Sequence, residues 1–223
     1  MNRSRGAVAC VVWIAALCGG ATVSVDPQTR YQTIEGLGTA IPEWRYSVNN
    51  STSLMDEMVN DLGVSMLRVY PEQDFEPSNE NGDEQVLEMD KFHPDASRTA
   101  AQFEVVRKAV DAGLERVILS VFSPPAWMKT NGDIANGGHL RADMFEEFAE
   151  YYAAYGKAMN EEIGIDVDAV SPENEPEWEQ WYASCVYTYE EMRDVTKAMG
   201  NRFVAEGVDT RIFAAETLID RNW

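Results

Sequence analysis

Basic residues and histidines are scarce in this chain of 223 residues. Lys and Arg together number 18 against 38 Asp and Glu, which gives a formal net charge of −20 at pH 7. Such a surface repels phosphate groups, so nucleic acids and anionic lipid surfaces are excluded as expected partners. The histidines are His93 and His139 alone. Two isolated imidazoles do not make a ligand set, so the sequence predicts no metal and no other cofactor.

Cysteine is almost as rare. Cys10 and Cys18 lie in the N-terminal segment, which leaves Cys185 alone in the rest of the chain. Once that segment is removed, an intramolecular disulfide is impossible. A catalytic thiol would need one of the two histidines as its base, and no motif surrounds either of them. Cys185 is therefore disfavoured as a catalytic thiol. Cys185 is predicted to be a partly buried thiol beside a substrate cleft.

Long hydrophobic runs are absent except at the N-terminus. The first five residues include the basic Arg3 and Arg5, residues 6–18 are apolar, and the small residues that follow offer a cleavage site. This pattern predicts a signal peptide over residues 1–21, too short to span a membrane. Residues 22–223 are expected to form a secreted or periplasmic protein without membrane insertion. Cys18 raises lipid attachment as an alternative, but Leu17 is larger than such sites usually accept.

Apolar, β-branched runs alternate with helical patterns along the rest of the chain, which predicts a parallel α/β sheet. Thr188 and Glu191 form a capping box that opens the last helical pattern. Periodicity alone leaves a closed barrel and a doubly wound open sheet as alternatives. The runs lie near residues 33–40, 65–70, 116–122, 167–171 and 211–215, and the helical patterns cover residues 53–62, 97–112, 142–163 and 188–206, each ending before a glycine.

The tripeptide Asn174-Glu175-Pro176 follows the fourth apolar run. A glutamate there would stand at the C-terminal end of a strand, where barrel enzymes keep their catalytic groups. The proline stops the strand because it cannot donate to the ladder, and the amide can bind a substrate hydroxyl group. The alternative is an ordinary solvated turn.

A second segment, residues 123–132 with the sequence SPPAWMKTNG, follows the third run. Two prolines fix the backbone and hold Trp127 in one place. A rigid indole at a strand end suits the apolar face of a sugar ring. Alternatively, the segment is a buried turn with Trp127 in the core.

The most acidic segment, from Glu72 to Asp90, has some likeness to a calcium-binding loop. When Gly82 is aligned with the glycine that such a loop requires, Pro77 falls where the first Asp ligand belongs. The segment is therefore predicted to be a solvated loop.

Together these segments resemble glycoside hydrolase family 30, whose members are retaining enzymes with a clan A (β/α)8 TIM barrel. The likeness covers residues 32–218 and rests on residues 123–132, on residues 170–176 and, as support, on residues 32–40 and Arg68. It departs from the family at Gly36-Leu37-Gly38, where a second glycine and a phenylalanine are common. Glu173 stands where a glutamine is frequent.

The resemblance implies a role for each candidate site residue. Glu175 matches the family's general acid/base, and Asn174 matches the residue that binds the sugar 2-hydroxyl. Arg68 matches the arginine that orients the nucleophile and keeps it ionised. Trp127 would be the sugar platform. Trp178 is a weaker candidate for the cleft wall, with a rim aromatic as the alternative.

The family's nucleophile lies on the seventh strand, whereas five strands fill this sequence. The chain is therefore expected to be the N-terminal portion of a barrel, truncated after about the fifth strand, with the nucleophile beyond the C-terminus and no activity of its own. Glu216, at the end of the fifth run, is expected to contact substrate or a neighbouring site residue rather than to replace the nucleophile. Glu173, Glu177 and Glu179 are expected to be solvated.

The resulting hypothesis is a secreted retaining hydrolase of β-linked polysaccharide, monomeric when complete. Xylan is favoured because Tyr182–Cys185 resembles the xylan-cleaving members. The alternatives are an exo-acting β-glucosidase or glucosylceramidase-like enzyme, and a non-catalytic carbohydrate-binding remnant that keeps Trp127.

Overall fold

The computed structural model describes residues 28–41, 51–80, 85–214 and 216–217, together with positions 24, 26 and 83. The predicted signal peptide, residues 1–21, lies outside these described residues. The chain divides into two units, Met1–Glu35 and Gly36–Trp223. Within the described part, every helix and strand belongs to the second unit, and no helix combines the length and the apolar character needed to cross a bilayer.

The second unit contains a five-stranded sheet in which all neighbouring strands are parallel. The strands follow the order of the chain and never reverse direction across the sheet. A doubly wound sheet reverses its order at a switch point, whereas successive barrel strands do not. The order of these five strands therefore favours the barrel over the doubly wound sheet. These strands are β1 (Gly38–Ala40), β2 (Met66–Val69), β3 (Arg116–Ser120), β4 (Val167–Ser171) and β5 (Arg211–Ile212).

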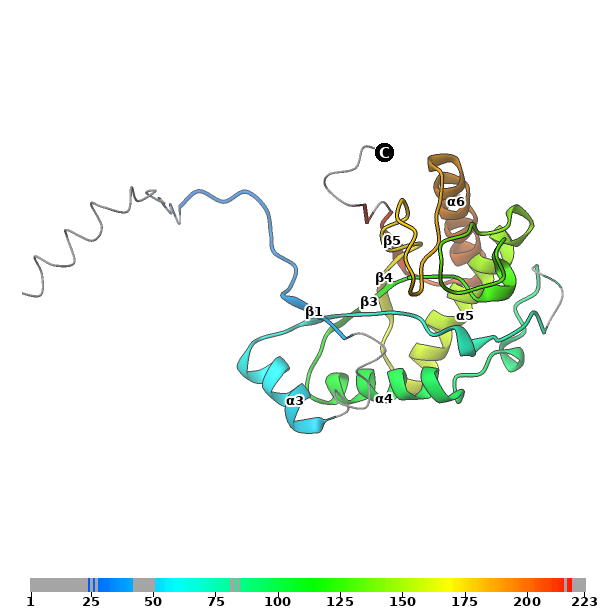
Figure 1. Ribbon diagram of the computed structural model, residues 1–223. Helices are drawn as coiled ribbons and strands as arrows, with labels where there is room; N and C mark the ends of the chain where they lie inside the picture. The colour runs from blue at the N-terminus through cyan, green and yellow to red at the C-terminus, as the bar shows by residue number, and fades with distance from the viewer. Residues whose placement is uncertain are drawn as a thin grey trace, which may run out of the picture. The chain divides into compact units, whose positions relative to one another are not determined.

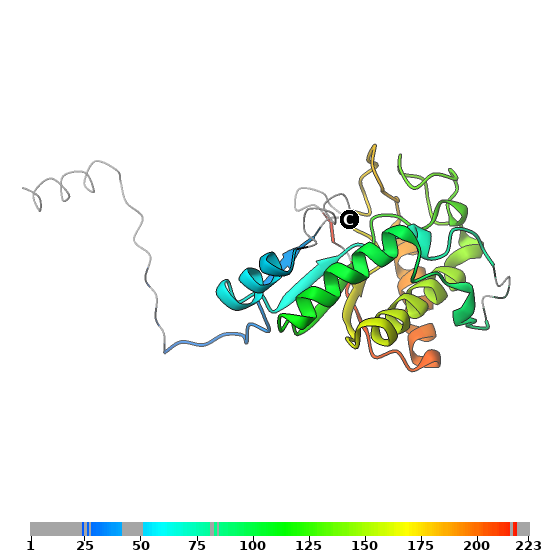
Figure 2. The same ribbon diagram turned by 90° about the horizontal axis from the view of Figure 1, so that it is seen from below.

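A helix connects each strand to the next, as the sequence predicts. The helices follow one another along the same face of the sheet (Figures 1 and 2), and each contacts the next one. Gly164 and Gly207 end two of them with φ angles of 82° and 66°, a conformation that favours glycine. The predicted capping box of the last helix is confirmed. The helices are α3 (Thr52–Asp56) with its π-helical continuation η2 (Glu57–Asp61), α4 (Ser97–Asp111), α5 (Phe145–Ile163) and α6 (Tyr189–Glu206).

The segment after β2 is more buried than the sequence suggested. The prediction of a solvated loop is wrong for its first half, because Glu72, Phe75 and Glu76 have exposures of 0%, 0% and 1%. The ring of Phe75 lies edge-on to those of Tyr151 and Tyr155 of α5, with centroids 5.5 and 4.7 Å away. An aromatic residue thus draws the acidic segment against a helix that lies far away in the sequence.

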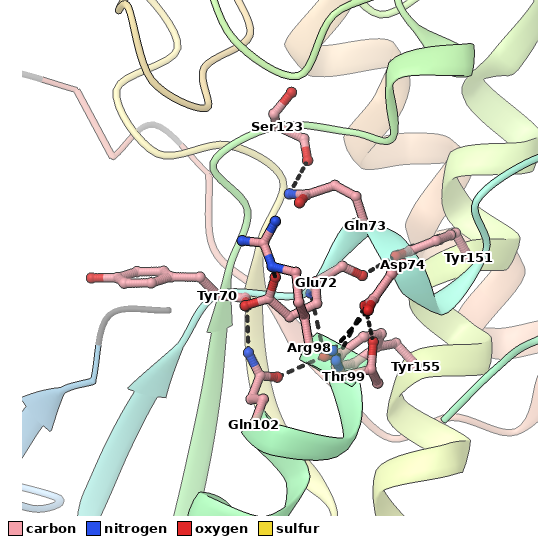
Figure 3. A network of polar contacts seen from close by, with 10 residues as sticks. All are labelled: Tyr70, Glu72, Gln73, Asp74, Arg98, Thr99, Gln102, Ser123, Tyr151 and Tyr155. Carbon is pink, nitrogen blue, oxygen red and sulfur yellow. Dashed lines mark hydrogen bonds and ion pairs between the residues drawn. The ribbon is translucent and has the colours of Figure 1, made fainter. Parts of the chain in front are cut away.

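Polar contacts fix the same segment to α4 and α5 (Figure 3). The Asp74 carboxylate accepts hydrogen bonds from the backbone N–H groups of Arg98 and Thr99 at 2.8 and 3.1 Å, so it caps the first turn of α4. Arg98 also forms an ion pair with the buried Glu72 at 2.9 Å. The Tyr151 hydroxyl donates to the Glu72 carbonyl. Glu72 and Asp74 therefore hold this segment in place.

Candidate active site

Glu175 lies just beyond the C-terminal end of β4, where the chain is held between its two neighbours. The Asn174 N–H donates to the Val121 carbonyl at 2.6 Å, on the side of β3. The Glu175 N–H donates to the Glu216 carbonyl at 3.1 Å, on the side of β5. Glu175 has a φ of 53°, which is uncommon for a residue with a side chain. Such conformations persist where neighbouring contacts impose them, and they cluster at functional sites.

Arg68, in β2, contacts four further side chains at this edge of the sheet. Its Nη2 donates to the Asn174 Oδ1 and to the Ser120 Oγ, both at 2.6 Å, and contacts the Glu216 Oε1 at 3.1 Å. Its Nη1 donates to the Tyr70 hydroxyl at 2.9 Å. Groups from the ends of β2, β3 and β4 and from the segment after β5 therefore meet around one guanidinium.

Sequence reasoning placed Arg68, Asn174, Glu175 and Glu216 at this edge but missed Ser120 and Tyr70. The Ser120 Oγ accepts from Arg68 and donates to the Glu216 Oε2 at 2.6 Å, so it links the two charged groups. A signal for both residues was available. Tyr70 stands two positions after Arg68, on the same face of an extended chain, and Ser120 is the last residue of β3.

The surroundings of Glu175 favour its protonated form. Partial burial is the main cause that raises the pKa of this carboxyl above its usual range, and the negative charges of Glu177 and Glu216 act in the same direction. The positive charge of Arg68 opposes them. A carboxyl group that keeps its proton to higher pH is suited to donate it in general acid catalysis.

Trp127 combines features of both readings of its segment. It lies in a short 3-10 turn, η5 (Ala126–Met128), is half-buried and packs against the core. Its Nε1 donates to the Glu76 carbonyl at 3.0 Å, which fixes the plane of the indole. Among the described residues, no hydrogen bond or ring contact joins Trp127 to Arg68, Asn174 or Glu175. Its role as a sugar platform stays a prediction.

Trp178 and Tyr182 lie on the loop that follows Glu175. The Trp178 N–H donates to the Glu175 carbonyl at 2.9 Å, and its side chain is 39% exposed, as expected of an aromatic at the rim. The sequence singled out Tyr182 only as part of the segment Tyr182–Cys185 and not as a site residue. Partial burial, and then the charge of Glu175, raise the pKa of its phenol, so the two side chains are close enough to interact.

The structure corrects two predictions about burial next to the site. Glu173 is 0% exposed, so the expectation that it is solvated is wrong, while Glu177 is half-buried and Glu179 exposed. Glu173 stands two positions after the buried Ser171 and continues the inward-facing alternation of β4. Cys185 is fully buried rather than partly buried, and its thiol is free.

The described residues contain no cluster of three or more His, Cys, Asp or Glu side chains that could hold a metal ion. The chemistry that the described groups offer is that of a half-buried carboxyl group beside an amide, a guanidinium and a second carboxylate.

Comparisons with known proteins identify relatives of this chain. The family model described as O-glycosyl hydrolase family 30 matches residues 82–220. The chain is 26% identical over 223 residues to an endo-1,6-β-D-glucanase of Neurospora crassa, and the match covers 90% of this chain and 45% of that protein.

Solved structures give the same result. The chain superposes on an endo-β1,6-glucanase with a TM-score of 0.69 and 26% identity, over 86% of this chain and 46% of the other. It superposes on a glycoside hydrolase family 30 subfamily 8 xylanase from Clostridium acetobutylicum with a TM-score of 0.67 and 25% identity, over 84% and 43%. The chain spans less than half the length of these relatives. Over that span it has the predicted α/β fold with a parallel sheet.

Proposed function

Because the chain belongs to O-glycosyl hydrolase family 30, we propose that it carries the acid/base part of a retaining hydrolase that cleaves β-linked polysaccharide. The position of Glu175 carries this proposal. Glu175 is a half-buried carboxyl group with a raised pKa, just beyond the end of β4. It lies beside the cluster that Arg68 forms with Asn174 and Glu216. Barrel enzymes place their catalytic groups at this end of the strands.

In the proposed reaction, Glu175 acts twice. It first donates its proton to the glycosidic oxygen while a second carboxylate attacks the anomeric carbon and the glycosidic C–O bond breaks. It then accepts a proton from the water molecule that hydrolyses the covalent glycosyl–enzyme intermediate. The proposal takes the nucleophile from the part of the relatives' fold that these 223 residues do not span. Glu216 keeps the role of a neighbouring contact.

Asn174 and Arg68 prepare the site for the sugar. Arg68 holds the Asn174 Oδ1 at 2.6 Å, which leaves the amide nitrogen to donate a hydrogen bond to the 2-hydroxyl group of the substrate. Hydrogen bonds to that hydroxyl strengthen in the transition state of glycoside hydrolysis. The same guanidinium would also orient an incoming nucleophilic carboxylate.

Two polysaccharides are candidates for the substrate. Xylan is favoured by the sequence Tyr182–Cys185 and by the likeness to the xylanase. β-1,6-Glucan is favoured by the relatives that are named endo-1,6-β-glucanases. Incubation of the full-length gene product with each polymer, followed by separation of the products, distinguishes them. A ladder of oligosaccharides indicates endo action, release of monosaccharide alone indicates the exo-acting alternative, and binding without cleavage indicates the carbohydrate-binding remnant.

Replacement of Glu175 by Gln tests the acid/base assignment. The variant keeps the shape of the side chain but has no proton to donate, so kcat/KM on the polysaccharide should fall by roughly 10²- to 10⁴-fold. In the wild type, kcat/KM should decline as the pH rises through the raised pKa of Glu175, and the variant should lack this decline. Glu179→Gln, an exposed residue of the same loop, serves as the control. Full activity of Glu175→Gln would contradict the assignment.

We also propose that the protein is exported from the cytoplasm, on the basis of its N-terminal sequence. A basic start, an apolar stretch and small residues precede position 22. Expression in a secreting host, followed by N-terminal sequencing of the protein outside the cytoplasm, should find a start near residue 22. Light scattering of the same full-length sample should give the mass of a monomer.

A further inference from the structure

A buried carboxyl group next to the proposed acid/base has no part in the proposed reaction. Glu173 precedes Asn174 and is 0% exposed. Its Oε1 accepts a hydrogen bond from the backbone N–H of Cys185 at 3.3 Å. Its Oε2 is buried and finds no hydrogen-bond partner among the described residues. A glutamate in this environment requires an explanation, because an uncompensated buried carboxylate is costly.

The contacts of Glu173 tie together two parts of the chain. Its carbonyl accepts from the Ser171 hydroxyl at 3.1 Å, which fixes its backbone to the end of β4. Its side chain reaches Cys185, at the far end of the loop that begins with Pro176. The Tyr187 N–H donates to the Pro176 carbonyl at 2.8 Å and closes the same loop.

Lys129 extends this connection to the segment after β3. Its side chain is 3% exposed, and its Nζ donates to the carbonyls of Ser184 and Ile134 at 2.6 and 3.2 Å. The residue next to Cys185 is thereby bound to the Trp127 segment. Glu173 and Lys129 together join three loops at the end of the sheet where Glu175 lies.

This inference rests on the proposed function. We propose that Glu173 is a positioning residue for the acid/base, because its buried carboxyl group clamps the Asn174-Glu175 turn onto the loop at Cys185. The clamp holds Glu175 in a backbone conformation, with φ 53°, that a residue with a side chain adopts only under constraint. Without it, the turn relaxes and the proton of Glu175 moves away from the glycosidic oxygen.

Glu173 performs this role in its neutral form. No Lys or Arg of the described part of the chain lies within ion-pair distance of it. Burial raises the pKa of Glu173 well above its usual range, the charge of Glu216 acts in the same direction, and Lys129 and the Cys185 N–H oppose them. The other groups that interact with its charge are the Cys185 thiol and the phenols of Tyr152 and Tyr187, and burial raises the pKa of each. Glutamine has the same shape and charge as the neutral carboxyl group and keeps its acceptor oxygen.

Two substitutions in the full-length gene product separate the clamp from simple packing. Glu173→Gln retains the acceptor for the Cys185 N–H, whereas Glu173→Met fills the same volume without one. We expect Glu173→Gln to keep kcat/KM within about threefold and Glu173→Met to lower it by roughly 10- to 100-fold on a substrate with a poor leaving group. Glu179→Met, on the exposed part of the same loop, is the control and should match the wild type. Thermal unfolding of each variant verifies that it is folded.

A pair of aryl β-glycosides supplies the readout that distinguishes positioning from a general loss of structure. A nitrophenol of low pKa leaves without a proton, whereas an unactivated phenol needs one from Glu175. Misplacement of Glu175 should therefore lower kcat/KM for the unactivated glycoside and change it little for the activated one. A folded Glu173→Met variant that loses activity equally on both glycosides would overturn the inference, as would one that equals the wild type.

The two proposals fail in different ways. If the wild type cleaves β-glycosides but Glu173→Gln is as impaired as Glu173→Met, the clamp by a neutral carboxyl group is wrong and the proposed function stands. If the full-length wild type cleaves no β-glycoside, the proposed function is wrong and the positioning role falls with it.

Discussion

Arg68 presents one guanidinium group to side chains from three other segments, which accounts for an arginine at this position of β2. A single Nη2 reaches the Asn174 Oδ1, the Ser120 Oγ and the Glu216 Oε1, while Nη1 reaches Tyr70. The planar fork satisfies several acceptors at once, which the point charge of a lysine does not. Arg68 therefore acts on Glu175 by two routes. Its charge lowers the pKa of the carboxyl group, which is the electrostatic route, and its hydrogen bond holds the neighbouring Asn174.

Substitution of Arg68 by Met tests the electrostatic route. The positive charge of Arg68 lowers the pKa of Glu175, so its removal should raise that pKa and move the alkaline decline of kcat/KM to higher pH. Loss of the hold on Asn174 should also reduce kcat/KM by about 10- to 100-fold. The pH profile of the full-length protein measures both effects. Arg193→Met, which removes an exposed ion pair with Asp194, is the control. A decline of kcat/KM that stays at the same pH or moves to lower pH would contradict the expected effect of Arg68 on the pKa of Glu175.

Glu76 is a second buried carboxyl group with a pH-dependent consequence. Burial raises its pKa from 4.5 to about 8, with the charges of Glu147, Glu150 and Glu80 adding to the shift and the Glu80 N–H opposing it. A pKa that is higher in the folded than in the unfolded state means that the folded protein binds the proton more tightly. Protonation of Glu76 therefore stabilises the folded protein. This stabilisation is fully present below pH 4.5 and is lost as the pH rises through about 8.

Melting temperatures between pH 5 and pH 9 measure this loss. The melting temperature of the wild type should fall over that range, and Glu76→Gln, which is neutral at every pH, should fall less. Exposed Glu115→Gln should follow the wild type. Because other buried carboxyl groups titrate in the same direction, the difference between Glu76→Gln and the wild type is the quantity that decides. Parallel curves would contradict the raised pKa.

At the scale of elements, the sequence was sufficient to predict those features that residues close together in the chain determine. The four helices end where Gly63, Gly113, Gly164 and Gly207 take positive φ angles, and the alternation of strands with helices gave the parallel sheet. Strand ends also placed Arg68, Asn174, Glu175 and Glu216 at one edge, since parallel strands bring their C-terminal ends together.

Burial imposed by distant contacts could not be predicted in this way. The acidic segment after β2 is buried because Phe75 packs on α5, which begins 70 residues further on at Phe145. Glu173 is buried where its side chain accepts the backbone N–H of Cys185, twelve residues further on, and nothing in an acidic cluster marks one member as inward-facing. For the same reason, Trp127 could be read as a platform or as core, and the structure gives it part of each environment.

Asp74 supplies a prediction at the scale of one helix. The N-cap position of α4 is Ala96, whose side chain cannot cap, and Asp74 accepts the backbone N–H groups of Arg98 and Thr99 in its place. Asp74→Ala should lower the free energy of unfolding by about 1–2 kcal/mol, as the loss of a helix cap does. Asp74→Asn keeps one acceptor oxygen and should lose less. Chemical denaturation measures both, and equal stability of Asp74→Ala and the wild type would show that α4 is not capped from this loop.

At the scale of the whole molecule, charge works against the compact state. With 38 acidic and 18 basic residues, the average interaction between charges is repulsive, and folding brings the charges closer together. Several of the ion pairs join exposed side chains, such as Arg193–Asp194 and Arg141–Asp143. Exposed pairs contribute at most about 1 kcal/mol each. Repulsion should therefore outweigh attraction among the exposed charges.

Added salt should consequently raise the melting temperature. The screening length falls from about 30 Å at 0.01 M to about 3 Å at 1 M ionic strength, so the long-range repulsion is lost while buried groups are little affected. A series of NaCl concentrations at pH 7, with sucrose as the uncharged comparison, measures the effect. Near the sequence isoelectric point of 4.3, the net repulsion vanishes and the same series should change the melting temperature much less. A melting temperature that falls with salt at pH 7 would mean that specific ion pairs, such as Arg202 with Glu150 and Glu206, contribute more to stability than the excess negative charge removes.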